Sequence, residues 1–168
     1  MSEVPVEFGA VLSNDGVYRY MLTRSWAAAS GEAVFVMLNP STADANIDDP
    51  TIRRCMNFAR DWGYGGIVVA NLYGLRATDP RELLAAEDPI GPENDEYLRG
   101  VIAGSQQWGY PVIAAWGVRG SDERVQAVRA MADEAGVELW CLGTAKAGQP
   151  KHPLYLPAKT RPTPWRKS

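Results

Sequence analysis

Several features that would indicate a membrane, secreted or metal-binding protein are missing from this sequence. None of its apolar runs is long enough to span a bilayer, and its first residues lack the basic and apolar regions of a secretory signal. It has two cysteines, Cys55 and Cys141, and one histidine, His152, which are too few for a zinc site closed by Cys and His. We therefore expect a cytoplasmic protein without membrane contact, metal or other cofactor.

Three motifs of common enzymes are also absent. No G-x-G-x-x-G follows a predicted strand, and neither a G-x-x-x-x-G-K-[ST] loop nor a G-x-S-x-G elbow occurs. Dinucleotide-dependent enzymes, P-loop enzymes and hydrolases with a serine elbow are therefore disfavoured. The groups left to carry chemistry are amides, carboxylates and a single imidazole.

Acidic residues are absent after Glu138, whereas six lysines and arginines follow it in a chain of net charge -3. A stripe of one sign can follow a phosphate backbone even on an acidic protein. A solvated basic terminus is the alternative interpretation. We expect residues 157–168 to form an extended basic tail.

The length and composition indicate one globular domain. With 168 residues, 46% apolar and 22% charged, the chain suits a single core, and we expect one α/β domain over 1–168. Residues 10–26 alternate around the turn Asn14-Asp15-Gly16 and predict a hairpin, so that 1–26 form an N-terminal β-hairpin unit.

Buried strands alternate with helices through the rest of the chain. Apolar runs at 33–38, 67–70, 112–116 and 137–142 predict four strands. Apolar periodicity and capping signals predict helices at 50–62, 80–86, 92–103 and 125–135. This alternation predicts a three-layer sandwich, in which helices cover both faces of a mostly parallel four-stranded central sheet. Ligands of such sheets bind beyond the carboxyl ends of the strands.

The residues at these strand ends carry two family resemblances. In chain order, the landmarks are Leu38-Asn39-Pro40-Ser41, Val69-Ala70-Asn71, Ala115-Trp116-Gly117 and Lys151-His152-Pro153-Leu154. They resemble those of the uracil-DNA glycosylase superfamily, which implies a uracil-DNA glycosylase-like fold. The fuller set N-P-S-T-A-D, D-D-P-T-I-R-R-C, A-W-G and G-Q-P-K-H-P-L-Y-L resembles more closely a bacterial and phage domain family of unknown function.

The glycosylase resemblance implies catalytic and base-reading roles. Cleavage of a base from deoxyribose needs a positioned water, a donor to the base oxygen and a recess for the flipped nucleotide. Asn39 would hold the water, with Asp48 or Asp44 as the base that activates it. Asn71 would read a pyrimidine edge, and His152 would donate to the base oxygen.

The remaining expected binding residues contact phosphate or stack on the base. Ser41, Thr42 and Lys151 would hold the flanking phosphates, and Pro40 and Gly117 belong to the same loops. Because no Phe occupies the usual stacking position, one of three aromatic residues would stack on the base: Tyr73, Trp116 or Tyr155.

Structural interpretations of the same residues stay open. Asn39 and Asn71 are also suited to turns, Trp116 to packing, and Asp49 to capping a helix.

The resemblance thus implies a metal-independent DNA glycosylase-like hydrolase acting on DNA rather than RNA. Two alternatives remain: a module that binds a modified base without cleaving it, and an enzyme of phage base modification that acts on free nucleotides. The sequence does not set the oligomeric state.

Overall fold

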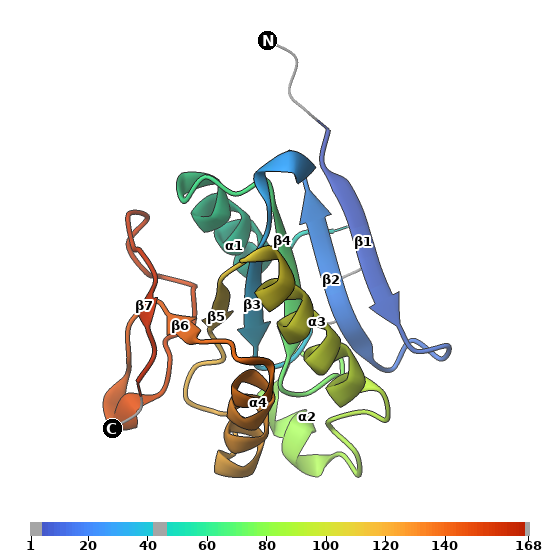
Figure 1. Cartoon of the computed structure of the whole chain (residues 1–168). Coiled ribbons are helices and arrows are strands. Elements are labelled where there is room, and N and C mark those ends of the chain that lie inside the picture. The colour runs from blue at the N-terminus through green and yellow to red at the C-terminus, as the bar shows by residue number, and fades with distance from the viewer. Residues whose placement is uncertain (1–4, 42–46, 167–168) are drawn as a thin grey trace.

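The protein is a sandwich of three layers, in which helices cover both faces of one sheet (Figure 1). The structure is a computed structural model that describes residues 5–41 and 47–166. Within these ranges the sheet has seven strands, in the order β1-β2-β4-β3-β5-β6-β7. The mixed α/β architecture agrees with the sequence, but the expectation of four strands is wrong.

The centre of the sheet is the parallel unit predicted from the apolar runs. It consists of β3 (Ala33–Met37), β4 (Gly66–Asn71), β5 (Val112–Ala114) and β6 (Leu139–Cys141), which are adjacent in the order β4-β3-β5-β6. Almost every residue of these strands is buried, because helices pack on both faces of the sheet.

Antiparallel strands at both edges account for the three additional strands. The hairpin strands β1 (Glu7–Leu12) and β2 (Arg19–Ser25) pair with each other, and β2 pairs with β4. At the opposite edge, β7 (Thr163–Pro164) pairs with β6. These pairings satisfy backbone groups that a four-stranded sheet would leave open at its edges.

In the described ranges, four α-helices connect the strands, and the first two begin where the capping signals predict. They are α1 (Pro50–Asp61), α2 (Pro80–Ala85), α3 (Asn94–Trp108) and α4 (Asp122–Ala135), with short 3-10 turns at Ala28–Ser30 and Lys146–Gly148. The side chains of Asp49, Asp79 and Ser121 accept hydrogen bonds from the first turns of α1, α2 and α4. The third helix begins two residues after Pro92 and continues past the predicted end at 103 to Gly109, which has a left-handed backbone.

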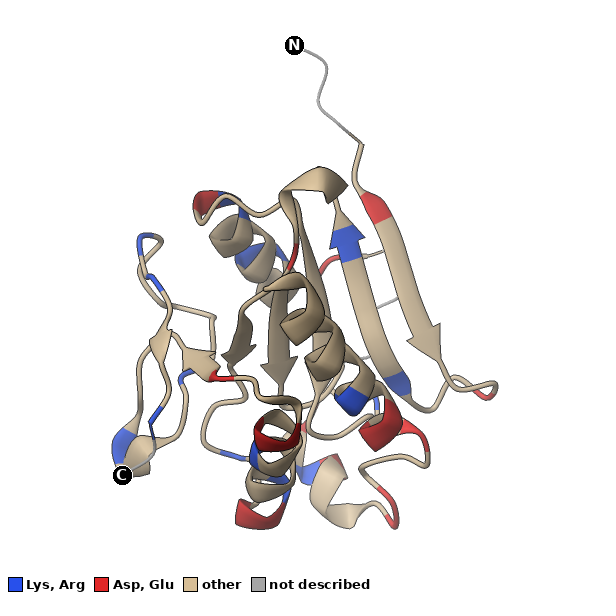
Figure 2. Ribbon diagram, viewed as in Figure 1, with Lys and Arg blue, Asp and Glu red and all other residues tan. Residues whose placement is uncertain are grey.

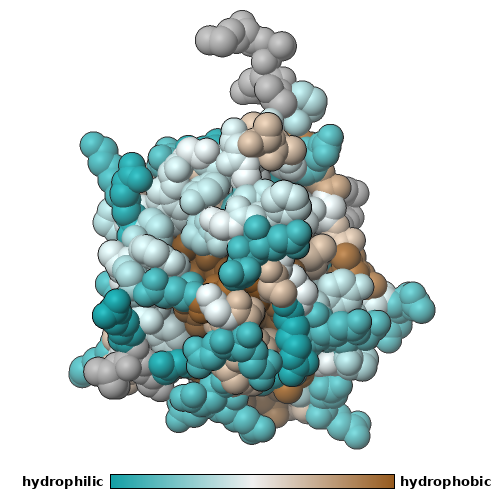
Figure 3. All heavy atoms as spheres, in the orientation of Figure 1, coloured by the Kyte–Doolittle hydropathy of each residue, from teal (hydrophilic) through white to brown (hydrophobic). Residues whose placement is uncertain are grey.

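The alternation of side chains along the strands divides the core into two clusters. Phe35 and Met37 face α1, whereas Val34 and Val36 face α3 and α4. On the α3 and α4 side, hydrophilic side chains cover the helices and apolar atoms remain visible in the recesses between them (Figure 3). Charged residues lie mainly on the helices and loops rather than on the central strands (Figure 2).

The C-terminal segment, expected to be an extended basic tail over 157–168, is partly held by the sheet. After β7, Trp165 is only 6% exposed, its backbone N–H donates to the Leu139 carbonyl over 2.8 Å, and its ring meets Trp116 edge-on. The basic residues nearby are exposed, but the described backbone around them is anchored. No helix in the described ranges is long and apolar enough to cross a membrane.

Candidate functional site

A cavity of about 690 Å³ opens at the carboxyl ends of the parallel strands. The chain runs from β3 to β4 on one side and then to β5 on the other, so a topological switch point lies between β3 and β5. Open α/β sheets bind ligands at such points, and the volume suits a small molecule. The cavity is where the sequence predicts a site.

Nine of the predicted site residues line this cavity. They come from four segments far apart in the chain: Asn39, Pro40, Ser41, Asn71, Trp116, Gly117, Lys151, His152 and Tyr155. Asp48 and Tyr73 do not line it. Thr42 and Asp44 lie outside the described residues.

Asn71 ends β4 as a buried amide that faces the cavity. The residue is 2% exposed and lines the cavity, and no described residue hydrogen-bonds to its side chain. Asn94 Oδ1 is fully buried and has no hydrogen-bond partner, but neither polar atom of the Asn71 side chain is in that state. A buried amide without a protein partner is costly unless water or a ligand satisfies it, so this side chain is poised for binding.

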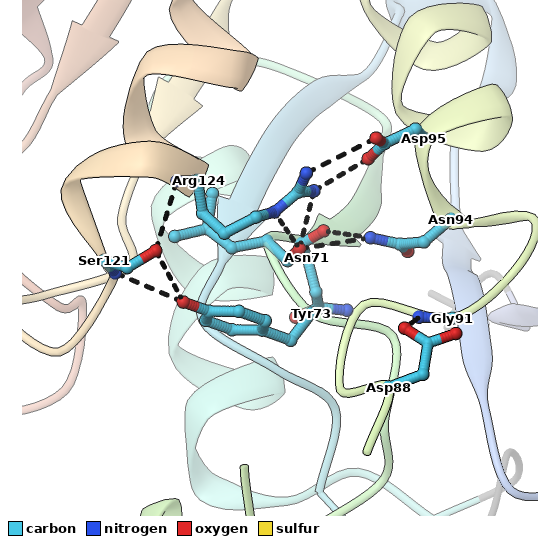
Figure 4. A network of polar contacts seen from close by, with 9 residues as sticks. Asn71, Tyr73, Asp88, Gly91, Asn94, Asp95, Ser121 and Arg124 are labelled. Carbon is cyan, nitrogen blue, oxygen red and sulfur yellow. Dashed lines mark hydrogen bonds and ion pairs between the residues drawn. The ribbon is translucent and has the colours of Figure 1, made fainter. Parts of the chain in front are cut away.

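A polar network holds the backbone immediately around Asn71 (Figure 4). Asn94 Nδ2 donates to the carbonyl oxygens of Asn71 and Leu72, over 3.0 and 3.2 Å. Arg124 donates to the same Leu72 oxygen through Nε and Nη2 and pairs with Asp95. The network fixes the strand end from the face opposite α1 and leaves the Asn71 side chain available.

The Asn39 amide is fixed by the chain segment that follows β4. Its Nδ2 donates to the Ala77 carbonyl over 2.8 Å and to the Pro40 carbonyl over 3.0 Å. These acceptors identify the Nδ2 side of the amide, so Oδ1 is the group left to accept a hydrogen bond at the cavity. Asn39 thus shapes its loop and also presents an acceptor.

His152 is held in one neutral tautomer. Its Nδ1 accepts a hydrogen bond from the Leu154 backbone N–H over 3.1 Å, so the neutral ring carries its proton on Nε2. Burial lowers the pKa of His152, and the negative charge of Asp49 opposes this shift only in part. At neutral pH the imidazole is therefore an uncharged donor at the cavity.

Among the described residues, the carboxylate that lines the cavity is Asp49 and not the predicted Asp48. Asp49 Oδ1 caps α1 by accepting from the Ile52 N–H over 2.8 Å, and Oδ2 accepts from the Ser41 hydroxyl over 2.9 Å. Asp48 Oδ1 lies 2.8 Å from Nε of the buried Arg24, in an ion pair outside the cavity lining. The capping signal identified Asp49 but said nothing about the direction in which its carboxylate faces.

Arg19 is a cavity residue that the sequence did not single out. It lies on β2, is 4% exposed and lines the cavity. Burial lowers its pKa to about 10, against the opposing effect of Asp49, so it remains a cation at neutral pH. The hairpin pattern predicted β2 but gave no sign that one of its arginines would reach the strand ends.

The three aromatic candidates differ in their surroundings. Trp116 belongs to the core: it is 1% exposed, and its Nε1 donates to Gln149 over 3.3 Å. The Tyr73 hydroxyl lies 3.2 Å from the Ser121 hydroxyl and lines a different cavity. Tyr155, with a left-handed backbone at φ 69° and 92% exposure, is the free aromatic ring at the mouth. A non-glycine residue in this conformation is strained, a feature that clusters at functional sites.

The loop after β6 is fastened against the end of β5. Gly117 has φ 76°, which favours glycine, and its N–H donates to the Pro150 carbonyl over 3.0 Å. The Lys151 N–H donates to the Gly143 carbonyl over 3.0 Å. These bonds place Lys151 and His152 beside the end of β5. In the described residues no group of three His, Cys, Asp or Glu side chains is arranged to hold a metal ion.

The comparisons with known proteins identify a family. Among solved structures, one match is the crystal structure of a mutant of the esterase rPPE, 18% identical, with a TM-score of 0.40 over 82% of this chain. The chain spans 42% of the length of that esterase chain. No curated protein matches. A family model described as "Protein of unknown function (DUF1643)" matches residues 19–154, and the chain belongs to this family.

Proposed function

We propose that this protein recognises a nucleobase, carried by DNA or by a nucleotide, in the cavity at the strand ends, and that it hydrolyses the N-glycosidic bond. One observation carries the proposal. Asn39, Asn71 and His152, from three distant segments of the chain, line one cavity, and the side chain of Asn71, a residue only 2% exposed, has no partner among the described residues.

The polar groups complement the edge of a planar heterocycle. Asn71 offers a carbonyl acceptor beside an amide donor, which matches two neighbouring groups on a base edge. His152 supplies a further donor from Nε2. Tyr155, exposed at the mouth, offers a ring on which the base stacks.

The same groups suit hydrolysis of the bond between sugar and base. A water oxygen bonds to C1′ as the bond from C1′ to the base nitrogen breaks, and the bonding electrons leave with the base. Asn39 Oδ1 orients the water and Asp49 accepts its proton. His152 donates a hydrogen bond to the oxygen of the departing base, where negative charge develops. Asp49 thus takes the role that the sequence gave to Asp48 or Asp44.

Three cations line the cavity and suit an anionic substrate: Arg19, Arg119 and Lys151. Arg19 lines the inner wall and Lys151 is exposed beside His152. Phosphate contacts of this kind position a nucleotide, and the amide contacts select the base.

The uracil-DNA glycosylase-like relationship and the cytoplasmic location remain predictions.

Strand scission after base removal tests the proposal directly. The protein is incubated with duplex and single-stranded oligonucleotides that contain uracil, hydroxymethyluracil or hypoxanthine, and abasic sites are cleaved with alkali. We expect scission with at least one base. For His152→Ala we expect a rate lower by about 10²–10³-fold, as for the loss of one preorganised donor. Arg99→Gln, on the exposed side of α3, is the matched control.

The alternatives give different results. A mobility shift without scission indicates a module that only binds the base. Release of free base from nucleotides, but not from DNA, indicates the free-nucleotide enzyme. No binding and no release with any of these compounds overturns the proposal, and unchanged turnover of His152→Ala removes that residue from the mechanism.

A further inference from the structure

A second cavity adjoins the first one and shares two of its wall residues. It has a volume of about 490 Å³ and lies between α2, the segment 86–90 and the start of α4. Pro80 and Arg119 line both cavities. The two cavities are therefore neighbours, with Arg119 in their shared wall.

The walls of the second cavity are apolar with polar groups at one side. Leu83, Pro89 and Ile90 contribute apolar surface, and Leu84 is 90% exposed at its rim. Tyr73, expected from the sequence to stack on a base, lines this cavity and not the first one. In Figure 4 the Tyr73 ring lies beside Ser121, at the start of α4.

Arg119 is the cation that the local ion pairs leave available. Arg81 pairs with Asp79 and Arg124 pairs with Asp95, each over 2.7 Å. In the described part of the chain no carboxylate lies within ion-pair distance of Arg119, although its charge contributes to the lowered pKa of Asp79 and Glu123 also lines the second cavity. An arginine side chain can donate two parallel hydrogen bonds to a phosphate.

We propose that the second cavity holds the nucleotide next to the one whose base occupies the first cavity, with Arg119 on the phosphodiester between them. The inference rests on the proposed function and makes it more specific: the substrate is a DNA strand rather than a free mononucleotide. The apolar walls and Tyr73 receive the neighbouring base, which stacking recognises without regard to its identity.

The test measures affinity as the ligand grows by one nucleotide at a time. The ligands are a mono-, a di- and a tetradeoxynucleotide with the same target base, carrying 2′-fluorine on the target sugar to resist cleavage. We expect the dinucleotide to bind the unmodified protein at least about tenfold more tightly than the mononucleotide, as stacking of one further base allows.

Two variants locate this gain in affinity. Ala86→Trp fills the second cavity, which Ala86 lines, without touching the first. It is expected to abolish the gain while the mononucleotide affinity stays unchanged, a result that also verifies its folding. Leu84→Gln, at an exposed position, is expected to reduce the gain.

Arg119→Gln is expected to reduce the slope of log affinity against log salt by about 0.7 for a single strand, and Arg99→Gln to leave it unchanged.

Failure of this inference is distinct from failure of the proposed function. Equal affinity for mono- and tetranucleotide in the unmodified protein, or a full gain in Ala86→Trp, overturns the second subsite but leaves base recognition standing. No binding of any ligand overturns the proposed function as well. Tighter binding of the matching tetraribonucleotide overturns the choice of DNA.

Discussion

Arg124 and Asp95 join the first turns of α4 and α3, with Nη2 2.7 Å from Oδ1. The same guanidinium donates two hydrogen bonds to the Leu72 carbonyl, one residue beyond Asn71. Two helices on one face of the sheet are thus tied to the end of β4. The ion pair therefore supports the strand end from which the Asn71 side chain reaches the cavity.

Asp95→Asn is expected to lower the free energy of unfolding by about 1–3 kcal/mol. The arginine side chain is 7% exposed and would lose its counter-charge, whereas Asp95 is 37% exposed, so solvent screening reduces the effect below that of a fully buried pair. Urea unfolding measures the change. A double-mutant cycle with Arg124→Met isolates the pair, and strictly additive effects would show that the two side chains do not interact energetically.

Asn71 and Asn94 are both buried, but their substitution is expected to have opposite effects on stability. Asn71→Leu removes an amide without a protein partner, so the free energy of unfolding should stay constant or rise by up to about 1 kcal/mol, while base affinity falls. Asn94→Leu removes two hydrogen bonds to backbone carbonyls and should lower stability by about 1–3 kcal/mol. Urea unfolding and ligand titration of both variants test this contrast. Equal destabilisation by both would contradict the binding role of Asn71.

His152 is expected to titrate below its ordinary pKa near 6.5, because burial disfavours the imidazolium. Between the lowered pKa and 6.5, the unfolded chain binds more protons than the folded chain, so stability rises with pH and is lost on acidification through this window. As the sequence contains one histidine, its imidazole NMR signals give the pKa without ambiguity. The difference in the free energy of unfolding between the protein and His152→Gln should decrease as the pH falls through this window. A pKa of 6.5 or more would refute the expected burial effect.

Trp165→Ala is expected to lower the free energy of unfolding by about 3–5 kcal/mol, as for other buried tryptophans. The ring packs against Trp116, lies beneath the Arg129 guanidinium and donates from Nε1 to the Gly148 carbonyl over 2.9 Å. Substitution of the exposed neighbour, Arg166→Ala, serves as the control, because the ion pair of Arg166 with Glu138 spans 3.9 Å at the surface and contributes little to stability. Thermal unfolding compares the two variants, and similar midpoints would show that the β7 segment is held loosely.

The parts of the fold that local chemistry specifies could be predicted from the sequence. Continuous apolar runs marked the parallel strands, and an aspartate before a proline marked the starts of α1 and α2. Strand β7 was missed because two residues, one of them a proline, carry no strand pattern. Only its pairing with β6 makes it a strand.

The meeting of three candidate site residues at one cavity was predictable from topology alone. Residues 39, 71 and 152 follow or end elements whose carboxyl ends share one edge, so their meeting follows from the alternation of strands and helices. Whether Asp48 and Tyr73 reach the cavity depends instead on the direction of their side chains. Both residues lie outside the regular strands and helices, where periodicity does not predict that direction. Beyond Asn71 the alternation of β4 no longer applies, and Tyr73 turns toward Ser121.

The β6–β7 ladder has a consequence for how this architecture can diverge. It brings the two ends of the excursion at 142–162 together, and that excursion carries Lys151, His152 and Tyr155. Because closing a chain segment costs only about 0.6 kcal/mol more for each doubling of its length, insertions at its tip are tolerated thermodynamically. The excursion can therefore change in length or sequence while the sheet beneath it keeps its strand pairing.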